Sequence, residues 1–142
     1  MSRSIDLKRH LFGFAIVASI AFFVANADRS HKFNVRDVDA AAAKQLMDAG
    51  ALIIDVRGKE AFLDDHIAGA LTMPLAELRT MVTAQKKTIA LDRPIVIYCG
   101  DGARSGPEGT YVMNQAGYSR AVNLKGGLEG WQKAGLRMAA GA

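Results

Sequence analysis

Cysteine, proline and tryptophan are scarce in this chain of 142 residues, which has 1 Cys, 3 Pro and 1 Trp. A single cysteine excludes an intrachain disulfide scaffold, and no group of Cys and His residues has the spacing of zinc ligands. No block of Lys and Arg, and no basic stretch interleaved with aromatic residues, indicates nucleic-acid binding. Hydrophobic residues make up 50% and charged residues 23%, a balance that excludes disorder and suits one globular domain.

Residues 1–27 have the three-part layout of a secretory signal peptide. Three Lys and Arg residues come first, an uncharged apolar run of 15 follows over 11–25, and Ala25-Asn26-Ala27 ends the segment. The run is shorter than the roughly 20 residues that cross a bilayer core. We therefore expect cleavage before Asp28 and an exported protein, periplasmic or secreted; the alternative is an uncleaved membrane anchor. Without this segment Lys and Arg fall from 18 to 15 and Asp and Glu from 14 to 13, so the net charge falls from +4 to +2.

Beyond residue 28, apolar runs alternate with segments of helical periodicity. The runs 51–56 and 94–98 are mostly apolar, as expected for strands covered on both faces. Such alternation predicts an α/β fold with a parallel sheet between helices. Further strands are expected at 33–35, 70–73 and 120–124, and helices from Asp37 or Asp39 to Ala49 and over 59–64, 76–87, 105–116 and 127–134.

The candidate chemistry lies in the segment Cys99-Gly100-Asp101-Gly102-Ala103-Arg104-Ser105, between the run 94–98 and a predicted helix. Open parallel sheets bind ligands at such an edge. Two glycines allow a tight loop whose N–H groups face inward and, with the helix N-terminus, hold an anion. Ser105 with Glu108 matches a capping box, which predicts that the helix starts directly after the loop. The helix dipole and Arg104 favour the thiolate of Cys99, which predicts a nucleophile for anionic substrates.

The alternative interpretation of Cys99 is structural. A lone cysteine after an apolar strand is commonly an inert small hydrophobic residue. The two glycines, the arginine and the capping-box pattern that follow within nine residues favour the nucleophile.

Four motifs, in order, resemble those of the rhodanese-like sulfurtransferases. They are Asp55-Val56-Arg57, His66-Ile67-Ala68-Gly69-Ala70, the segment from Cys99 to Ser105, and the C-terminal set Gly117-Tyr118, Asn123-Leu124-Lys125-Gly126-Gly127 and Gly130-Trp131. Each motif alone has low specificity, but the ordered set covers nearly all of residues 33–137. The resemblance implies one rhodanese-like domain over 28–142, with a five-stranded parallel sheet flanked by helices on both faces.

The resemblance also implies a two-step sulfur transfer. The Cys99 thiolate takes the outer sulfur of thiosulfate, sulfite leaves, and the resulting persulfide passes its sulfur to cyanide or a thiol. By this reading Gly100, Asp101, Gly102, Ala103, Arg104 and Ser105 bind the substrate and the persulfide. Arg104 attracts the sulfonate end of the donor. No metal or organic cofactor is expected, because the protein itself carries the sulfur.

Loop length separates this chemistry from that of Cys-dependent phosphatases. Those enzymes place five residues between the cysteine and the arginine, whereas four lie between Cys99 and Arg104. A shorter cradle fits a single sulfur atom better than a tetrahedral phosphate, so phosphatase or arsenate-reducing activity ranks below sulfur transfer.

Three further residues are supporting candidates. Asp55 is expected to fix nearby backbone amides or to pair with a cation. Arg57 either adds to the field near the loop or forms a solvated ion pair. His66 is a candidate general base, but a mechanism that starts from a thiolate has little need of one, and the resemblance favours a hydrogen-bonding role at the sheet edge.

The chain also departs from the family pattern. Ala61 stands where an acidic residue is common, and Asp65 stands in place of a usual glycine. Asp101 adds a negative charge to the loop: pointing inward it repels thiosulfate, and pointing outward it attracts a cationic acceptor. Two alternative functions therefore stay open, a non-catalytic binding module and a carrier that receives its sulfur from another protein.

Overall fold

The computed structural model describes residues 32–84 and 89–142 of the chain. Backbone contacts divide the chain between Lys32 and Phe33, and Phe33–Ala142 is a compact unit that contains the helices and strands named below. The predicted signal peptide and its cleavage site before Asp28 lie outside the described residues.

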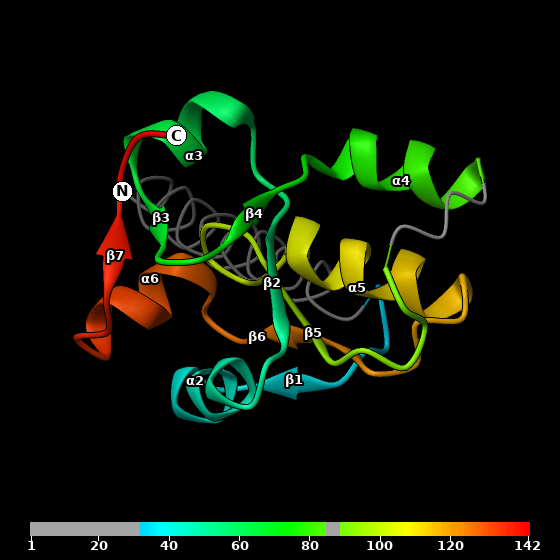
Figure 1. The fold of residues 1–142 in the computed structure, drawn as a ribbon, viewed down its shortest axis with the longest axis horizontal. Helices are drawn as coiled ribbons and strands as arrows, with labels where there is room; N and C mark the ends of the chain where they lie inside the picture. The colour runs from blue at the N-terminus through cyan, green and yellow to red at the C-terminus, as the bar shows by residue number, and fades with distance from the viewer. Residues whose placement is uncertain (1–31, 85–88) are drawn as a thin grey trace, which may run out of the picture. The chain divides into compact units, whose positions relative to one another are not determined.

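A five-stranded parallel sheet lies at the centre of this unit, in the order β1-β6-β5-β2-β4 (Figure 1). Its strands are β1 (Asp37–Val38), β2 (Leu52–Asp55), β4 (Leu71–Thr72), β5 (Ile95–Tyr98) and β6 (Ala121–Leu124). The central strand β5 pairs with both β2 and β6, so Ile97 lies between Ile54 and Asn123. Because every strand of this sheet runs in the same direction, the carboxyl ends meet at one edge. The predicted parallel sheet is confirmed.

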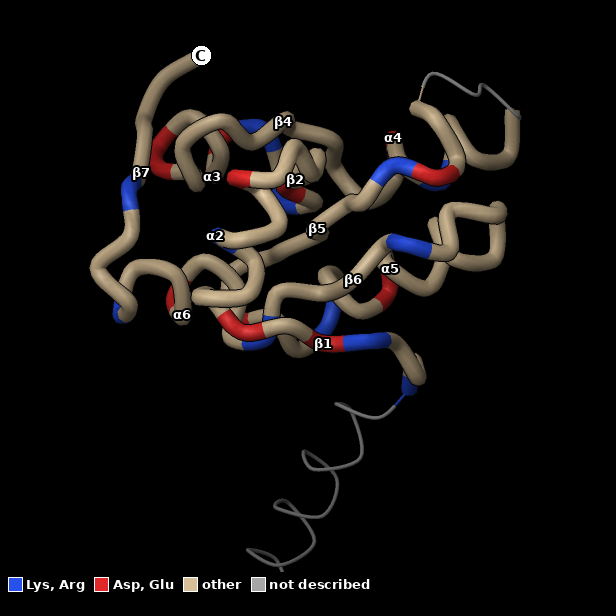
Figure 2. Tube along the Cα trace, turned by 60° about the horizontal axis from the view of Figure 1, so that its bottom comes forward, with Lys and Arg blue, Asp and Glu red and all other residues tan. Residues whose placement is uncertain are grey.

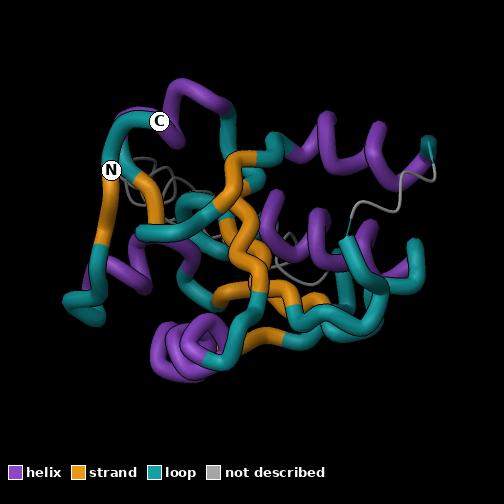
Figure 3. The backbone as a smooth tube through the Cα atoms, in the orientation of Figure 1, coloured by secondary structure: helices purple, strands orange, loops and turns teal. Residues whose placement is uncertain are grey.

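Helices cover both faces of the sheet (Figure 3). They are α2 (Ala40–Asp48) and α6 (Gly127–Lys133) on one face, and α4 (Leu75–Thr83) and α5 (Ser105–Gln115) on the other. Successive strand residues alternate between two cores: Ile53 and Val96 pack toward α2 and α6, whereas Ile54 and Ile97 pack toward α4 and α5. Burial on both faces explains why these strands are apolar without alternation.

The helix boundaries follow local signals. Asp39, not Asp37, caps α2, because its carboxylate accepts the Ala42 N–H at 2.8 Å. The helix α3 (Lys59–Asp64) has the predicted bounds. The helix α4 ends at Thr83 rather than at Lys87, and residues 85–88 lie outside the described structure.

Two predictions about strands were incomplete or wrong. The first strand is Asp37–Val38 and not 33–35. The N–H groups of Asn123, in β6, and of Lys125, directly after it, donate to the carbonyls of Arg36 and Val38, and Val38 is the residue that enters the core. An antiparallel pair, β3 (His66–Ile67) and β7 (Met138–Ala139), was not predicted. Each of these strands has two residues, which is too short for a periodicity to show.

Charges of both signs are interspersed along the described chain (Figure 2), as expected from the lack of a basic block. Within residues 32–84 and 89–142, no helix is long and apolar enough to cross a membrane.

Candidate active site

Cys99 directly follows β5, at the carboxyl edge of the sheet where the sequence placed it. Its side chain belongs to the core between the sheet and the helices α4 and α5, and the residue is only 3% exposed. The sulfur lies beside the first turn of α5, because a Cβ added to Gly106 would be 3.4 Å from Cys99 Sγ. The positive end of an eleven-residue helix therefore adjoins the sulfur.

The carbonyls of the loop are directed to donors outside it. The Cys99 and Gly100 carbonyls accept the N–H groups of Leu128 and Glu129, at 2.9 and 3.0 Å, in the first turn of α6. The Gly102 carbonyl accepts from Asn123 Nδ2 at 3.1 Å. These bonds engage three of the loop's carbonyls with donors on β6 and α6.

The amides of the same loop are largely open. Among residues 100–105, only the Ala103 N–H has a hydrogen-bond acceptor in the described structure. Free amides in a tight loop before a helix N-terminus are donors that an anion can use. The predicted anion cradle needs such donors, and the cradle itself stays a prediction.

Asp101 points into the loop. The Cys99 thiol donates to Asp101 Oδ1 at 3.7 Å, and the Ala103 N–H donates to the same oxygen at 3.0 Å. Of the two orientations considered from the sequence, the structure therefore has the inward one.

Arg104 is exposed and holds the N-cap position of α5. Its guanidinium forms neither an ion pair nor a hydrogen bond within the described residues, so it is available to an anion. The predicted capping box is wrong, because Ser105 is already the first helical residue and the helix has no side-chain cap. Glu108 instead forms an ion pair with Arg79 of α4, whose charge attracts it.

Glycines allow the loop to lie directly on the turn between β6 and α6. A Cβ on Gly102 would be 2.6 Å from the amides of Gly126 and Gly127. A Cβ on Gly127 would be 2.4 Å from the Cys99 carbonyl oxygen. Side chains at these positions would push the two backbones apart.

Asp55 and Arg57 form a network at the end of β2. Asp55 accepts the Arg57 N–H at 2.9 Å and pairs with the Arg57 guanidinium at 2.8 Å, as its predicted role requires. The guanidinium also pairs with Asp65 at 3.1 Å, and Gln132 donates to Asp65 at 3.1 Å. Burial lowers the pKa of Arg57, but hydrogen bonds and charges from Asp55 and Asp65 outweigh it and raise that pKa overall. Arg57 is thus neutralised within a half-buried network, and Asp65 has a definite partner.

His66 has a structural environment. The ring is buried, its Nδ1 lies 2.8 Å from the Phe62 carbonyl oxygen, and the ring stacks on Phe62 at a centroid distance of 3.8 Å. No hydrogen bond within the described residues joins His66 to Cys99. The structure gives His66 the hydrogen-bonding role rather than the position of a general base.

From the sequence, Asn123 was named only within the C-terminal motif, and no role at the site was assigned to it. Asn123, 1% exposed on β6, donates through Nδ2 to Gly102 O and, at 2.8 Å, to Asp37 Oδ1 on β1. Its Oδ1 has no hydrogen-bond partner among the described residues, and a Cβ on Gly106 would collide with it at 2.4 Å. Besides that motif, the signal in the sequence was a polar residue within the otherwise apolar strand Ala121–Leu124.

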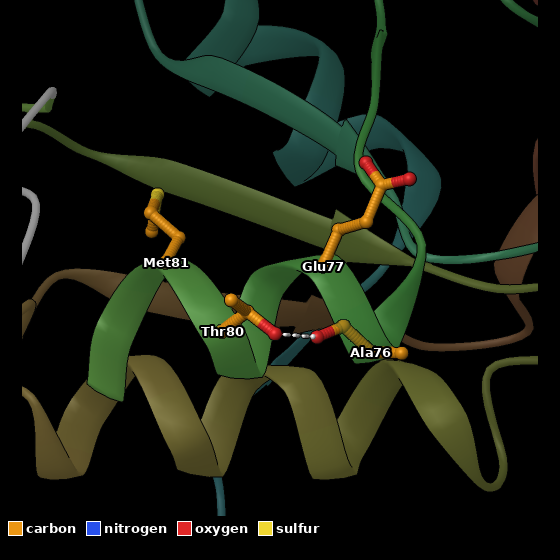
Figure 4. Close-up of a pocket in the computed structure, with 4 residues that line it drawn as sticks. All are labelled: Ala76, Glu77, Thr80 and Met81. Carbon is orange, nitrogen blue, oxygen red and sulfur yellow. Dashed lines mark hydrogen bonds between the residues drawn. The ribbon is translucent and has the colours of Figure 1, made fainter. Parts of the chain in front are cut away.

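A separate open pocket lies on α4, lined by Ala76, Glu77, Thr80 and Met81 (Figure 4). None of these residues belongs to the loop, and Glu77 is paired with Lys59. Within the described residues, no group of His, Cys, Asp and Glu side chains is placed to hold a metal ion.

Comparison with known families adds a match over most of the compact unit. The rhodanese-like domain family matches residues 39–134. A sulfurtransferase of Allochromatium vinosum is 34% identical over 108 residues, which cover 75% of this chain and 96% of that protein. The thiosulfate sulfurtransferase GlpE of Stutzerimonas stutzeri is 32% identical over 90 residues, which cover 63% of this chain and 78% of that protein.

Solved structures are similar as well. The crystal structure of the Alr3790 protein from Anabaena sp. superposes with a TM-score of 0.64 at 27% identity, covering 73% of this chain and 92% of that one. The human single-domain sulfurtransferase TSTD1 superposes with a TM-score of 0.61 at 24% identity, covering 70% of this chain and 97% of that one, a likeness of fold.

Proposed function

The chain belongs to the rhodanese-like domain family, and from this premise we propose that it is a sulfurtransferase that carries a sulfane sulfur as a persulfide on Cys99. The observation that carries the proposal is the loop after β5: three of its carbonyls accept from donors outside it, most of its N–H groups have no acceptor within the described residues, and its cysteine adjoins the first turn of α5. The donor proposed is thiosulfate, after which the Stutzerimonas relative, a thiosulfate sulfurtransferase, is named.

In the first step, the Cys99 thiolate attacks the outer sulfur of thiosulfate. A new S–S bond forms to Cys99, the S–S bond of the donor breaks, and sulfite leaves with the bonding electrons. Arg104 attracts the sulfonate group and stabilises the departing sulfite, because its charge is not taken up by a carboxylate.

In the second step, cyanide or a thiolate attacks the outer sulfur of the persulfide. Thiocyanate or a new persulfide leaves, and Cys99 recovers its thiolate, so the kinetics are ping-pong. The open amides of 100–105 stabilise the anionic outer sulfur between the two steps. The supporting residues Asp55, Arg57 and His66 act through the shape of this edge of the sheet.

The test is the mass of the intact protein before and after treatment with thiosulfate. We expect an increase of about 32 Da in the wild type, removed by cyanide with release of thiocyanate, and no increase in Cys99→Ala. Absence of the adduct, or an adduct of equal size in Cys99→Ala, would contradict the proposal and favour a non-catalytic binding module.

A second candidate is a carrier that receives its sulfur from another protein. The inward carboxylate of Asp101 favours it, because the carboxylate opposes a small dianionic donor at the same sulfur. Slow loading by thiosulfate together with rapid exchange with a protein persulfide would identify this candidate.

We also propose that the protein is exported, on the layout of residues 1–27. N-terminal sequencing of the exported protein should begin at Asp28. An intact N-terminus in a membrane fraction would identify an uncleaved anchor instead.

A further inference from the structure

One carboxylate oxygen occupies the mouth of the loop. Asp101 Oδ1 accepts both the Cys99 thiol, at 3.7 Å, and the Ala103 N–H, at 3.0 Å. Among the N–H groups of residues 100–105, that of Ala103 is the one with an acceptor in the described structure, and this acceptor is a carboxylate of the loop itself. Cys99 is 3% exposed whereas Asp101 is exposed, so the carboxylate lies on the outer side of the sulfur.

No cation of the described chain neutralises this carboxylate. Among residues 32–84 and 89–142, Asp101 forms no ion pair, and the guanidinium of Arg104, three residues away, bonds to no carboxylate. Any anionic donor that reaches Cys99 must therefore approach a full negative charge within a few ångströms of the sulfur. The repulsion grows in proportion to the charge of the donor.

Donors of the same sulfur differ in that charge. Thiosulfate carries two negative charges, and an organic thiosulfonate, R–SO2–S⁻, carries one. In both cases the Cys99 thiolate forms the new S–S bond and the donor's own S–S bond breaks. The leaving group is the sulfite dianion from thiosulfate and the sulfinate monoanion R–SO2⁻ from the thiosulfonate, so atoms and charges balance for each.

We propose that Asp101 is a specificity-determining residue that makes this site prefer monoanionic sulfane-sulfur donors over the thiosulfate dianion. This inference rests on the proposed function, since it concerns how the same cysteine is loaded. Thiosulfate is then a slow donor for this site, and a singly charged donor is a faster one.

The experiment compares kcat/KM for thiosulfate and for methanethiosulfonate in the wild type and in Asp101→Asn. Asparagine keeps a side-chain oxygen that can accept the Ala103 N–H, and it removes only the charge. We expect thiosulfate to gain about tenfold in kcat/KM and methanethiosulfonate about threefold or less, so that the preference between donors shifts toward thiosulfate. Asp101→Ser, which also accepts from a nearby amide, should shift the preference in the same direction.

Asp92→Asn is the matched control. It removes the same charge from an exposed residue before β5, at the opposite edge of the sheet, and should leave the ratio of the two kcat/KM values unchanged. Added salt should reduce the preference of the wild type but not that of Asp101→Asn, which a purely structural role of Asp101 would not produce.

The outcomes separate the inference from the proposed function. If both donors load Cys99 and the ratio stays within about twofold in Asp101→Asn and Asp101→Ser, the inference is overturned and the sulfurtransferase stands. If neither donor loads Cys99 in any variant, while unfolding curves show all of them folded, the proposed function and the inference fall together.

Discussion

Tyr98, the residue before the cysteine, is completely buried and still engages its hydroxyl. The N–H of Ile67, in β3, donates to Tyr98 Oη at 3.1 Å, which joins β5 to β3. Burial, followed by the negative charge of Asp55, raises the pKa of Tyr98 well above the value of about 10 that tyrosine has in water. The folded protein therefore keeps a proton that the unfolded chain releases in alkali.

Because the pKa of Tyr98 is higher in the folded protein than in the unfolded chain, the protein loses stability in alkali. Below about pH 10, the phenol of Tyr98 is protonated in both the folded and the unfolded protein, so the free energy of unfolding does not depend on it. Above about pH 10, the unfolded chain loses this proton while the folded protein keeps it, so the free energy of unfolding falls as the pH rises. Tyr98→Phe should cost about 1 kcal/mol at neutral pH, through the lost acceptor for Ile67. It should also remove part of the alkaline decline, which reaches at most about 1.4 kcal/mol per pH unit for one group.

Urea unfolding over a series of pH values up to the alkaline range measures both effects. Tyr111→Phe is the control, because that side chain is 40% exposed, and it should leave the alkaline slope as in the wild type. Equal slopes for the wild type and Tyr98→Phe would contradict the assignment.

At the scale of elements, the loop after β5 takes its shape from the turn between β6 and α6. The first amides of α6 hold the carbonyls of Cys99 and Gly100, and Gly102 packs against the backbone of Gly126 and Gly127. Gly126 and Gly127, at the start of α6, thus form the backbone surface on which the active loop packs.

Gly127→Ala should disrupt this contact between α6 and the active loop. Its φ is +53°, and a Cβ would lie 2.4 Å from the Cys99 carbonyl oxygen, so both strain and a backbone collision oppose the methyl group. We expect a loss of stability of about 2 kcal/mol or more and a slower reaction of Cys99 with thiosulfate.

Gly135→Ala separates the two causes. Gly135 has a similar φ of +69°, but a Cβ there meets nothing within 4 Å. It should cost only the strain, about 1 kcal/mol, and leave the loading of Cys99 intact. If the two substitutions slow the loading of Cys99 equally, the contact between Gly127 and the loop does not control the reactivity of the cysteine.

Element positions were predictable where the local signal was strong. The runs that became β2 and β5 were mostly apolar, as strands covered on both faces are, and Asp39 was one of the two residues expected to begin α2. The misplaced first strand and the false capping box have a common cause. In both, a tertiary contact decided the local structure: pairing with β6 placed β1, and Arg79 took the Glu108 carboxylate.

At the scale of the whole molecule, parallel pairing explains why the site could be located from sequence at all. Since strand ends converge, Cys99 and Asp55 had to meet at one edge of the sheet. The orientation of Asp101 and the link from Asn123 to Asp37 were not predictable. The first depends on a single side-chain torsion, and the second joins residues 86 positions apart.

Asn123→Ala tests that long-range link. It removes the donor to Gly102 O and Asp37 Oδ1, so we expect a stability loss of about 1–3 kcal/mol and slower loading of Cys99 by thiosulfate. Asn114→Ala is the matched control, because Asn114 Nδ2 also donates twice, to the carbonyls of Tyr118 and Ala121. It should lower the unfolding midpoint similarly without changing the rate at Cys99. If both variants slow that rate equally, Asn123 has no special bearing on the loop.

The outward hydrogen bonds of the loop carbonyls bear on how far this chemistry can be moved between proteins. Donors for those carbonyls come from Leu128, Glu129 and Asn123, all later in the chain than the loop itself. A synthetic peptide of residues 99–105, or its transplant into an unrelated scaffold, would keep the thiol and lose the partners that turn its backbone. Engineers who want this reactivity elsewhere would have to graft residues 123–129, from β6 into α6, along with it.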